Sequence, residues 1–187
     1  MRRSLTLKRA ASAVALVVAG LGFARMGSAA QTDAELVTEA RQTMALYGQK
    51  DPSIGSFFRR SVGYVVFPSV GKGGLGIGGA HGVGILFENG AAVGKVTLNQ
   101  VSVGAQAGGE EFSQIVFYDV PSALAELKAG KAQLSGQLSA VALKQGAAAN
   151  SRFKNGVAVF TATKGGLMLE ASVAGQKFEY HAFPAPM

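Results

Sequence analysis

Residues 63–90 read GYVVFPSVGKGGLGIGGAHGVGILFENG, and this stretch decides the fold. From residue 74 onward glycine fills most even positions, and apolar side chains fill odd ones: Leu75, Ile77, Val83, Ile85 and Phe87. A period of two predicts β-structure with one apolar face and one nearly bare face. Such a bare face lets another backbone or a helix approach closely. Asn89-Gly90 then predicts a tight hairpin turn.

The same stretch contains a literal GxGxxG pattern at residues 71–76, directly after a predicted strand. A dinucleotide site needs a helix behind these glycines, because the helix N-terminus holds the pyrophosphate. Glycine at every second position is incompatible with a stable helix. We therefore reject dinucleotide binding, and the pattern of a phosphate-binding loop is absent.

Residues 1–30 have the organisation of a secretory signal peptide. A positive start is followed by the apolar run 10–21, and Ser28 to Ala30 supply small residues at a cleavage site. The alternative is an uncleaved membrane anchor, for which the run is short. We expect an exported protein, periplasmic, secreted or associated with the cell envelope. The general and twin-arginine export routes both stay open, since Arg2-Arg3 begins the segment.

Charge and cysteine content narrow the function classes. The chain has 18 Lys and Arg and 11 Asp and Glu, and five basic residues lie in the predicted signal peptide. The remainder carries 13 − 11 = +2, so we expect no nucleic-acid partner. The absence of cysteine excludes disulfides, thiolate metal sites, a cysteine nucleophile and an acylated N-terminal cysteine.

Two helices are predicted before the glycine-rich stretch. Thr32 and Glu35 form a capping box at the start of a helix over residues 32–47. Asp51-Pro52 has the form of an N-cap and a first-turn proline, and starts a short helix that ends at Arg59-Arg60.

Phe57 and Phe58 stand beside Arg59 and Arg60 in this short helix, and two interpretations are open. In the first, the rings enter a bilayer interface while the guanidinium groups contact lipid phosphates. In the second, the rings enter the core and the arginines are solvated.

The rest of the chain is mainly strand-forming. We predict a short strand over 64–67 that Pro68 ends, further strands over 91–98, 101–106, 112–118, 132–143, 157–163, 167–173 and 177–181, a helix over 122–128 and a loop over 146–155. The expected fold class is α+β, mainly β: an antiparallel barrel or sandwich of six to nine strands with N-terminal helices packed on it. We expect a single domain over residues 31–183 and a flexible tail over 184–187.

No catalytic or metal-binding constellation stands out. His81 and His181 are far apart in the sequence, without ligand spacing. Glu110 and Glu111 would point to opposite faces of a strand, so they do not form a pair with Asp119. We predict a protein that is not an enzyme and has no cofactor and no metal.

Three segments together resemble the SYLF domain. They are VFPSVGKGGLGIGGAHGVGILFENG at 66–90, GAQAGGEEFSQIVFYD at 104–119 and FKNGVAVFTATKGGLMLEASVAG at 153–175. The resemblance extends over residues 46–180. It implies a lipid-binding module, since eukaryotic SYLF proteins bind phosphoinositides and some act with actin, whereas bacterial ones are exported.

The resemblance also implies a site. Membrane contact in the eukaryotic family is attributed to an N-terminal amphipathic helix with basic residues, which corresponds here to residues 54–60. We therefore predict lipid or membrane binding by Phe57, Phe58, Arg59 and Arg60, with Lys72 as the nearest other cation. Export argues against an actin partner. The alternative is a non-catalytic structural or protein-interaction component of the cell envelope, docking through a sheet edge or the glycine face.

Overall fold

The computed structural model describes residues 31–134, 138–164, 173 and 175–184, without the side chains of 75–77 and 102–108. The chain divides into two units, Met1–Ala30 and Gln31–Met187, and the second contains every element that follows. Its elements in order are α1 (Asp33–Lys50), the 3-10 helix η1 (Pro52–Ile54), α2 (Gly55–Arg60), β1 (Gly63–Glu88), β2 (Ala91–Tyr118), α3 (Pro121–Lys128), β3 (Val141–Ala142), η2 (Ala148–Asn150), β4 (Val157–Thr163) and β5 (Lys177–Ala182).

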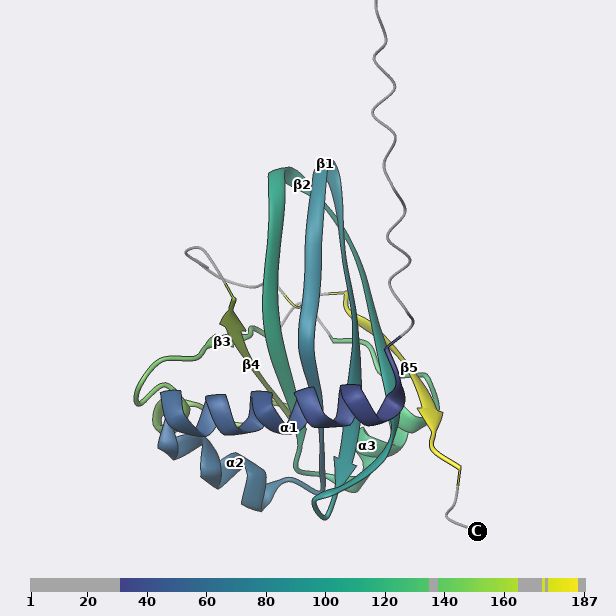
Figure 1. Ribbon diagram of the computed structural model, residues 1–187. Coiled ribbons are helices and arrows are strands. Elements are labelled where there is room, and N and C mark those ends of the chain that lie inside the picture. Colours follow the sequence, from purple (N-terminus) through teal and green to yellow (C-terminus); the bar gives the residue numbers. More distant parts are fainter. Residues whose placement is uncertain (1–30, 135–137, 165–172, 174, 185–187) are drawn as a thin grey trace, which may run out of the picture. The chain divides into compact units, whose positions relative to one another are not determined.

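A single long hairpin of β1 and β2 forms the centre of this unit (Figure 1). The strands contain 26 and 28 residues and pair from Gly63–Tyr118 to Glu88–Ala91. Asn89 and Gly90 close the hairpin with φ values of 50° and 78°. Positive φ at both positions is what a type I′ turn requires, so the predicted turn is confirmed.

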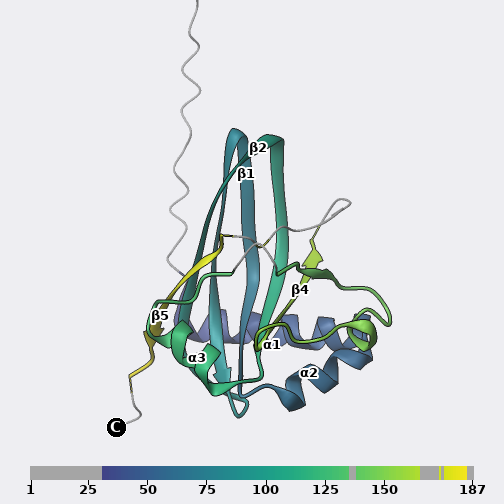
Figure 2. The same ribbon diagram turned by 180° about the vertical axis from the view of Figure 1, so that it is seen from behind.

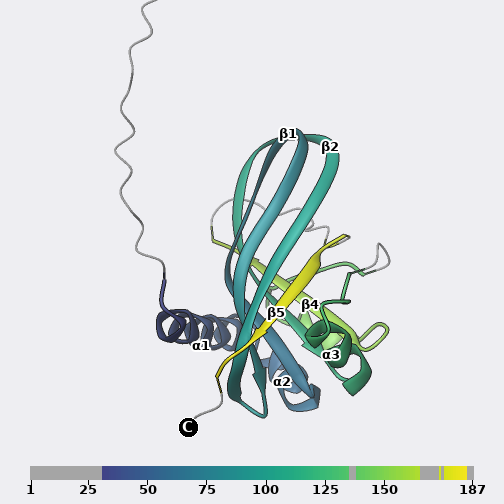
Figure 3. The same cartoon turned by 90° about the vertical axis from the view of Figure 1, so that its right-hand side faces the viewer.

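Both strands turn over together at the end of the hairpin away from the helices (Figure 3). The pairing changes register there, between Leu75–Ala107 and Ile77–Val103. Extra residues on one strand increase bend and twist, and glycine permits the sharp curvature. The hairpin is thereby divided into a first arm, residues 63–72 with 109–118, and a second arm, residues 78–88 with 91–102.

The two arms pack against each other at the bare glycine face. A Cβ built on Gly84 would lie 2.5 Å from the Val66 carbonyl oxygen, and one on Gly82 would lie 2.8 Å from that of Ser69. Because no side chain fits in this space, β1 is able to fold across itself. The predicted close approach is confirmed, and the partner is the other arm of the same strand.

Two cores lie on opposite sides of the hairpin. The outer core packs α1, α2 and β4 on the face that carries Tyr64, Val66, Ile85 and Phe87. The inner core lies between the arms and includes Val65, Phe67 and Leu86, closed by α3 and β5. Figures 1 and 2 show α1 and α2 on one side of the hairpin, with α3 on the other. In the described part of the chain, no helix is long and apolar enough to span a membrane.

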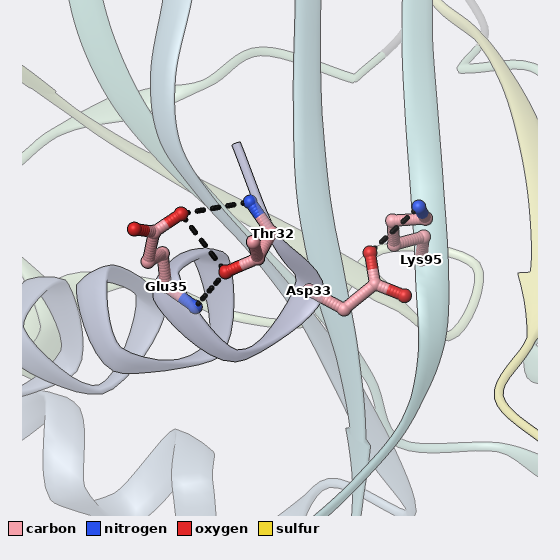
Figure 4. A network of polar contacts seen from close by, with 4 residues as sticks. All are labelled: Thr32, Asp33, Glu35 and Lys95. Carbon is pink, nitrogen blue, oxygen red and sulfur yellow. Dashed lines mark hydrogen bonds and ion pairs between the residues drawn. The ribbon is translucent and has the colours of Figure 1, made fainter. Parts of the chain in front are cut away.

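Helix α1 starts as the sequence predicts (Figure 4). The Glu35 backbone N–H donates to the Thr32 hydroxyl oxygen at 3.3 Å, and the Thr32 backbone N–H donates to the Glu35 carboxylate at 2.8 Å. Asp33 in the same turn forms an ion pair of 2.7 Å with Lys95 of β2. These contacts fix the acidic N-terminal end of α1 on the second arm.

The sheet order is β1-β2-β4-β3, and β5 pairs with the other half of β2. β3 runs parallel to β4, while the other pairs are antiparallel. The α+β, mainly β class is therefore confirmed, although the sheet is open and not closed into a barrel. The separate strands that the sequence suggested over 64–118 are the two strands of one hairpin.

Other local predictions have different outcomes. Pro68 does not end the first strand, because it lies in a register shift between Phe67 and Val70 where a ladder N–H is not needed. The described residues of the predicted strand over 132–143 form only β3 and isolated bridges, and Leu134 belongs to the inner core while Leu143 packs on the outer core; residues 135–137 lie outside the described part. β5 and α3 are confirmed. The predicted strand over 167–173 falls almost wholly outside the described residues.

A network of three buried glutamines joins the two arms inside the inner core. Gln114 on the first arm donates its Nε2 to the Gln176 Oε1 at 2.8 Å, and Gln176 Nε2 donates back to the Gln114 Oε1 at 3.2 Å. Gln176 Nε2 also reaches the Oε1 of Gln100, on the second arm, at 3.4 Å. The amides satisfy one another in a site from which water is excluded.

Candidate lipid-binding surface

The aromatic residues of the predicted site lie in the core. Phe57 is 2% exposed, and its ring centroid lies 4.8 Å from that of Phe160 and 5.7 Å from that of Phe117. Phe58 is half-buried, edge-on to Tyr64 and Phe117 at 5.0 and 4.9 Å. The burial of Phe57 corrects the prediction for that ring, whereas Phe58 is only half-buried and its contact with a bilayer stays a prediction. The reason is that α2 has an extensive aromatic sheet face beneath it, so the rings bury more surface there.

The arginines of α2 are exposed, as both interpretations require. The Arg60 guanidinium lies 5.1 Å above the Phe153 ring, and its Nη2 lies 3.9 Å from an Asp119 carboxylate oxygen. At that distance, and with the Arg60 side chain 59% exposed, the ion pair stabilises little. Arg59 precedes it on the exposed side of the same turn.

Lys72 is not part of the same surface. It lies in β1 nine residues beyond Gly63, roughly 30 Å along an extended strand from the end of α2. It pairs across the strands with Glu110, near the bend of the hairpin. The structure therefore brings Arg59 and Arg60 together, but it places Lys72 at the opposite end of the first arm.

Two cations that the sequence analysis missed lie near the α2 arginines. The Phe153 ring lies tilted against Phe57 at a centroid distance of 4.9 Å and beneath the Arg60 guanidinium, and its neighbours in the chain are the exposed residues Arg152 and Lys154. We call Arg59, Arg60, Arg152 and Lys154 the basic surface. A compositional signal for it exists: no Asp or Glu lies between Glu126 and Glu170, whereas six Lys and Arg do.

Asp51 positions the second half of this surface. Its buried carboxylate accepts from the Ser53 hydroxyl at 2.6 Å, and from the backbone N–H of Ser53 at 3.1 Å and of Ala148 at 2.7 Å. Burial raises the pKa of Asp51, but the hydrogen bonds outweigh it and hold the pKa below its usual 3.8. One carboxylate thus ties η2, and the segment with Arg152, to the start of η1.

A hollow of about 230 Å³ opens beside Arg152 and Lys154. Ser139 and Ser151 also line it, with Val157–Val159 of β4 as its apolar wall, and the Ser151 hydroxyl donates to the Ala147 carbonyl oxygen at 2.8 Å. The Arg152 Nη1 donates to the carbonyl oxygens of Ser151 at 2.8 Å and Ala149 at 3.3 Å, which orients the guanidinium. Cations and hydroxyls of this kind are the groups that bind phosphate oxygens.

A second, larger groove of about 300 Å³ lies between the C-terminal half of α1 and the sheet, and we call it the α1 groove. Its lining residues are Thr43, Leu46, Tyr47, Lys50, Pro68, Ser113, Ala162, Thr163 and Lys164. Burial raises the pKa of Tyr47 far above its usual 10.0, and its hydroxyl donates to the Ser113 carbonyl oxygen at 2.8 Å. The Tyr47 hydroxyl is therefore a structural donor.

Titratable groups do not converge elsewhere in the described residues. His81 Nδ1 lies 2.9 Å from the Asn99 Oδ1 on the surface, and His181 is exposed on β5. Glu111 binds Ser69 and Lys164 at 2.7 and 2.9 Å, hydrogen bonds that lower its pKa. Within the described ranges, no group of three or more His, Cys, Asp or Glu side chains is placed to hold a metal ion.

No protein-family model matches this chain, and no curated protein sequence matches it. The resemblance to the SYLF domain therefore stays a prediction. The case for function consequently depends on the basic surface, the two hollows and the charge distribution of the chain.

Proposed function

We propose that the protein binds anionic phospholipid surfaces through the basic surface and catalyses no reaction. The observation that carries the proposal is the contact of Phe153 with Phe57 and Arg60 of α2, which brings the exposed Arg152 and Lys154 on either side of Phe153 to the neighbourhood of the α2 arginines. Each basic residue near an anionic membrane contributes about 1 kcal/mol of attraction. The adjoining hollow, which Ser139, Arg152 and Lys154 line, gives a phosphate group a place to bind.

The proposal changes the mechanism that the sequence suggested. The aromatic rings of α2 stay in the core and hold the helix, while the cations contact the membrane. Membrane association is then mainly electrostatic and peripheral, so it should weaken steeply as salt is added. The proposed location is the exported, cell-envelope side, in keeping with the predicted signal peptide over residues 1–30.

The alternative is a protein-interaction component of the envelope. Docking through the glycine face has less support than the sequence suggested, because the first arm of the same hairpin covers this face at Gly82 and Gly84. Docking through a sheet edge stays open as an outcome of the test below.

Sedimentation with vesicles tests the proposal. The protein is mixed with phosphatidylcholine vesicles, with and without phosphatidylglycerol, at low and high salt. We expect it to pellet with the anionic vesicles only. The double variants Arg59→Glu with Arg60→Glu and Arg152→Glu with Lys154→Glu should each weaken binding by about tenfold or more.

The matched control is Lys131→Glu with Lys177→Glu, which makes the same charge change at exposed lysines outside the basic surface. It should leave most of the binding intact. Equal losses in all three variants would show a response to net charge alone. Binding that ignores both basic-surface variants would refute the surface, and recovery of envelope proteins without vesicle binding would favour the alternative.

A further inference from the structure

We infer that the α1 groove is a binding site for a single acyl chain that carries an anionic head group. The inference rests on the proposed function in naming a lipid-class ligand. It adds a site for one molecule, separate from the basic surface, since the groove uses Lys50 and Lys164 and none of the four basic-surface residues.

The polar side chains of Tyr47 and Ser113 in the floor of the groove are hydrogen-bonded within the protein. The Tyr47 hydroxyl and Ser113 bind each other and neighbouring carbonyl oxygens: Tyr47 donates to the Ser113 carbonyl, and the Ser113 hydroxyl donates to that of Ala162 at 3.2 Å. Their hydrogen-bonding capacity is thus largely used within the protein. What the groove offers a ligand is mainly the exposed apolar side chain of Leu46, above a floor in which Pro68 and Ala162 are buried.

Leu46 is the apolar residue of the groove that is most exposed to solvent. It lies on the rim of the groove and is 55% exposed, which makes it one of the three large apolar side chains that the described part of the chain leaves in water. The next turn of α1 contributes Lys50 to the same rim. An apolar edge beside an ammonium group is complementary to an amphiphile with an anionic end.

Lys164 supplies the second cation from the opposite wall. Its Nζ lies 2.9 Å from the Glu111 carboxylate, which also accepts the Ser69 hydroxyl at 2.7 Å. Glu111 thereby fixes the position of the Lys164 side chain just beyond β4 and partly neutralises its positive charge. No ion pair joins Lys50 to an acidic group in the described residues, so Lys50 carries the larger share of the head-group attraction.

The size of the groove selects the ligand. About 300 Å³ is at the lower end of small-molecule sites, which suits part of one chain and excludes the two chains of a phospholipid side by side. The occupant that we propose is therefore a free fatty acid, whose single chain carries its own anionic end. One acyl chain of a membrane lipid would offer the same chemistry, and titration with a free fatty acid in the absence of vesicles tests the proposed occupant directly.

Calorimetric titration with dodecanoate below its micelle concentration tests the site on the intact protein. We expect saturable binding of dodecanoate, no binding of butanoate, and binding of uncharged dodecanol that is weaker by about fivefold or more. Leu46→Asn should weaken dodecanoate binding by about tenfold, since it removes apolar contact with the chain. Lys50→Glu should weaken dodecanoate but not dodecanol.

Val101→Asn is the matched control for Leu46→Asn, because Val101 is 76% exposed and lies outside the groove. Thermal unfolding confirms that each variant is folded. The inference is overturned if dodecanoate does not bind, or if Leu46→Asn and Lys50→Glu bind it as the wild type does. Vesicle binding without dodecanoate binding refutes the groove alone, while dodecanoate binding without vesicle binding refutes the proposed membrane surface alone.

Discussion

The two ends of the β1–β2 hairpin are built from the same residue types and differ in packing. At the helix end, a Cβ on Gly84 would lie 2.5 Å from a backbone oxygen and 2.7 Å from the Phe67 ring. Toward the bend, a Cβ on Gly71 would meet nothing within 4 Å. Glycine is therefore a packing requirement at Gly84, whereas at Gly71 there is room for a side chain. Composition alone does not separate these two cases.

The largest effect should come from the aromatic cluster at the helix end. Phe57→Ala removes a buried ring that contacts Phe117, Phe153 and Phe160, and we expect a loss of about 3–5 kcal/mol in the free energy of unfolding. Denaturant titration measures it. Phe58→Ala, at a half-buried ring, should cost less. A loss below about 1 kcal/mol for Phe57→Ala would mean that the ring is not packed in the core.

Gly84→Ala tests the crossing of the two arms. The added methyl group has to displace the Val66 carbonyl or the Phe67 ring, so we expect a loss of about 2–3 kcal/mol in the free energy of unfolding. Thermal and denaturant unfolding report it. An unchanged stability would show that the arms do not approach each other as closely as the structure has them.

The stability of the helix end of the hairpin depends on pH through the Asp51 carboxylate. Because the folded-state pKa is lowered, its contribution is present above the unfolded pKa near 3.8 and is lost as the pH falls through the folded pKa. Asp51→Asn leaves the Ala148 N–H badly partnered and should cost about 2 kcal/mol at pH 7. The difference between wild type and variant should shrink below pH 4, and a constant difference down to pH 2 would contradict the assignment.

Gly71→Ala should have the smallest effect and completes the comparison with Gly84→Ala. Gly71 has ordinary backbone geometry and open space around its Cα, so we expect a change within about 0.5 kcal/mol. Unfolding measured beside the Gly84 variant gives the contrast directly. A large loss at Gly71 would show that the strand toward the bend also has a close neighbour.

Local signals in the sequence were the dependable ones. The Thr32–Glu35 capping box and the Asn89-Gly90 turn depend on neighbours in the chain, and both are observed. A second Asn-Gly pair, Asn155-Gly156, also adopts positive φ values, 53° and 78°, where a loop was predicted. The same dipeptide thus forms a turn at both places. The second turn is not predicted as a hairpin because the strand before it is a single bridge at Lys154, which is too short to show alternating apolar and polar residues.

Non-local features were not predictable from the sequence. The burial of Phe57 depends on Phe117 and Phe160, which lie 60 and 103 positions later in the chain. The basic surface combines two segments, and only the long run without acidic residues indicates it. Lys72 was assigned to the site because it is close to α2 in sequence, and an extended strand then carries it away.

The three glutamines of the inner core have a consequence for strand registration. Each of their amides is satisfied by residues that lie 62 or 76 positions apart in the chain. A slip of one residue in β2 would turn Gln114 toward the outer core and leave buried amides without partners, which is costly where water is excluded. Glycine-rich strands are otherwise prone to slippage, because they have few side chains to fix their alignment. The network therefore fixes the alignment that the glycines leave open, and it does so through Gln176, the residue directly before β5.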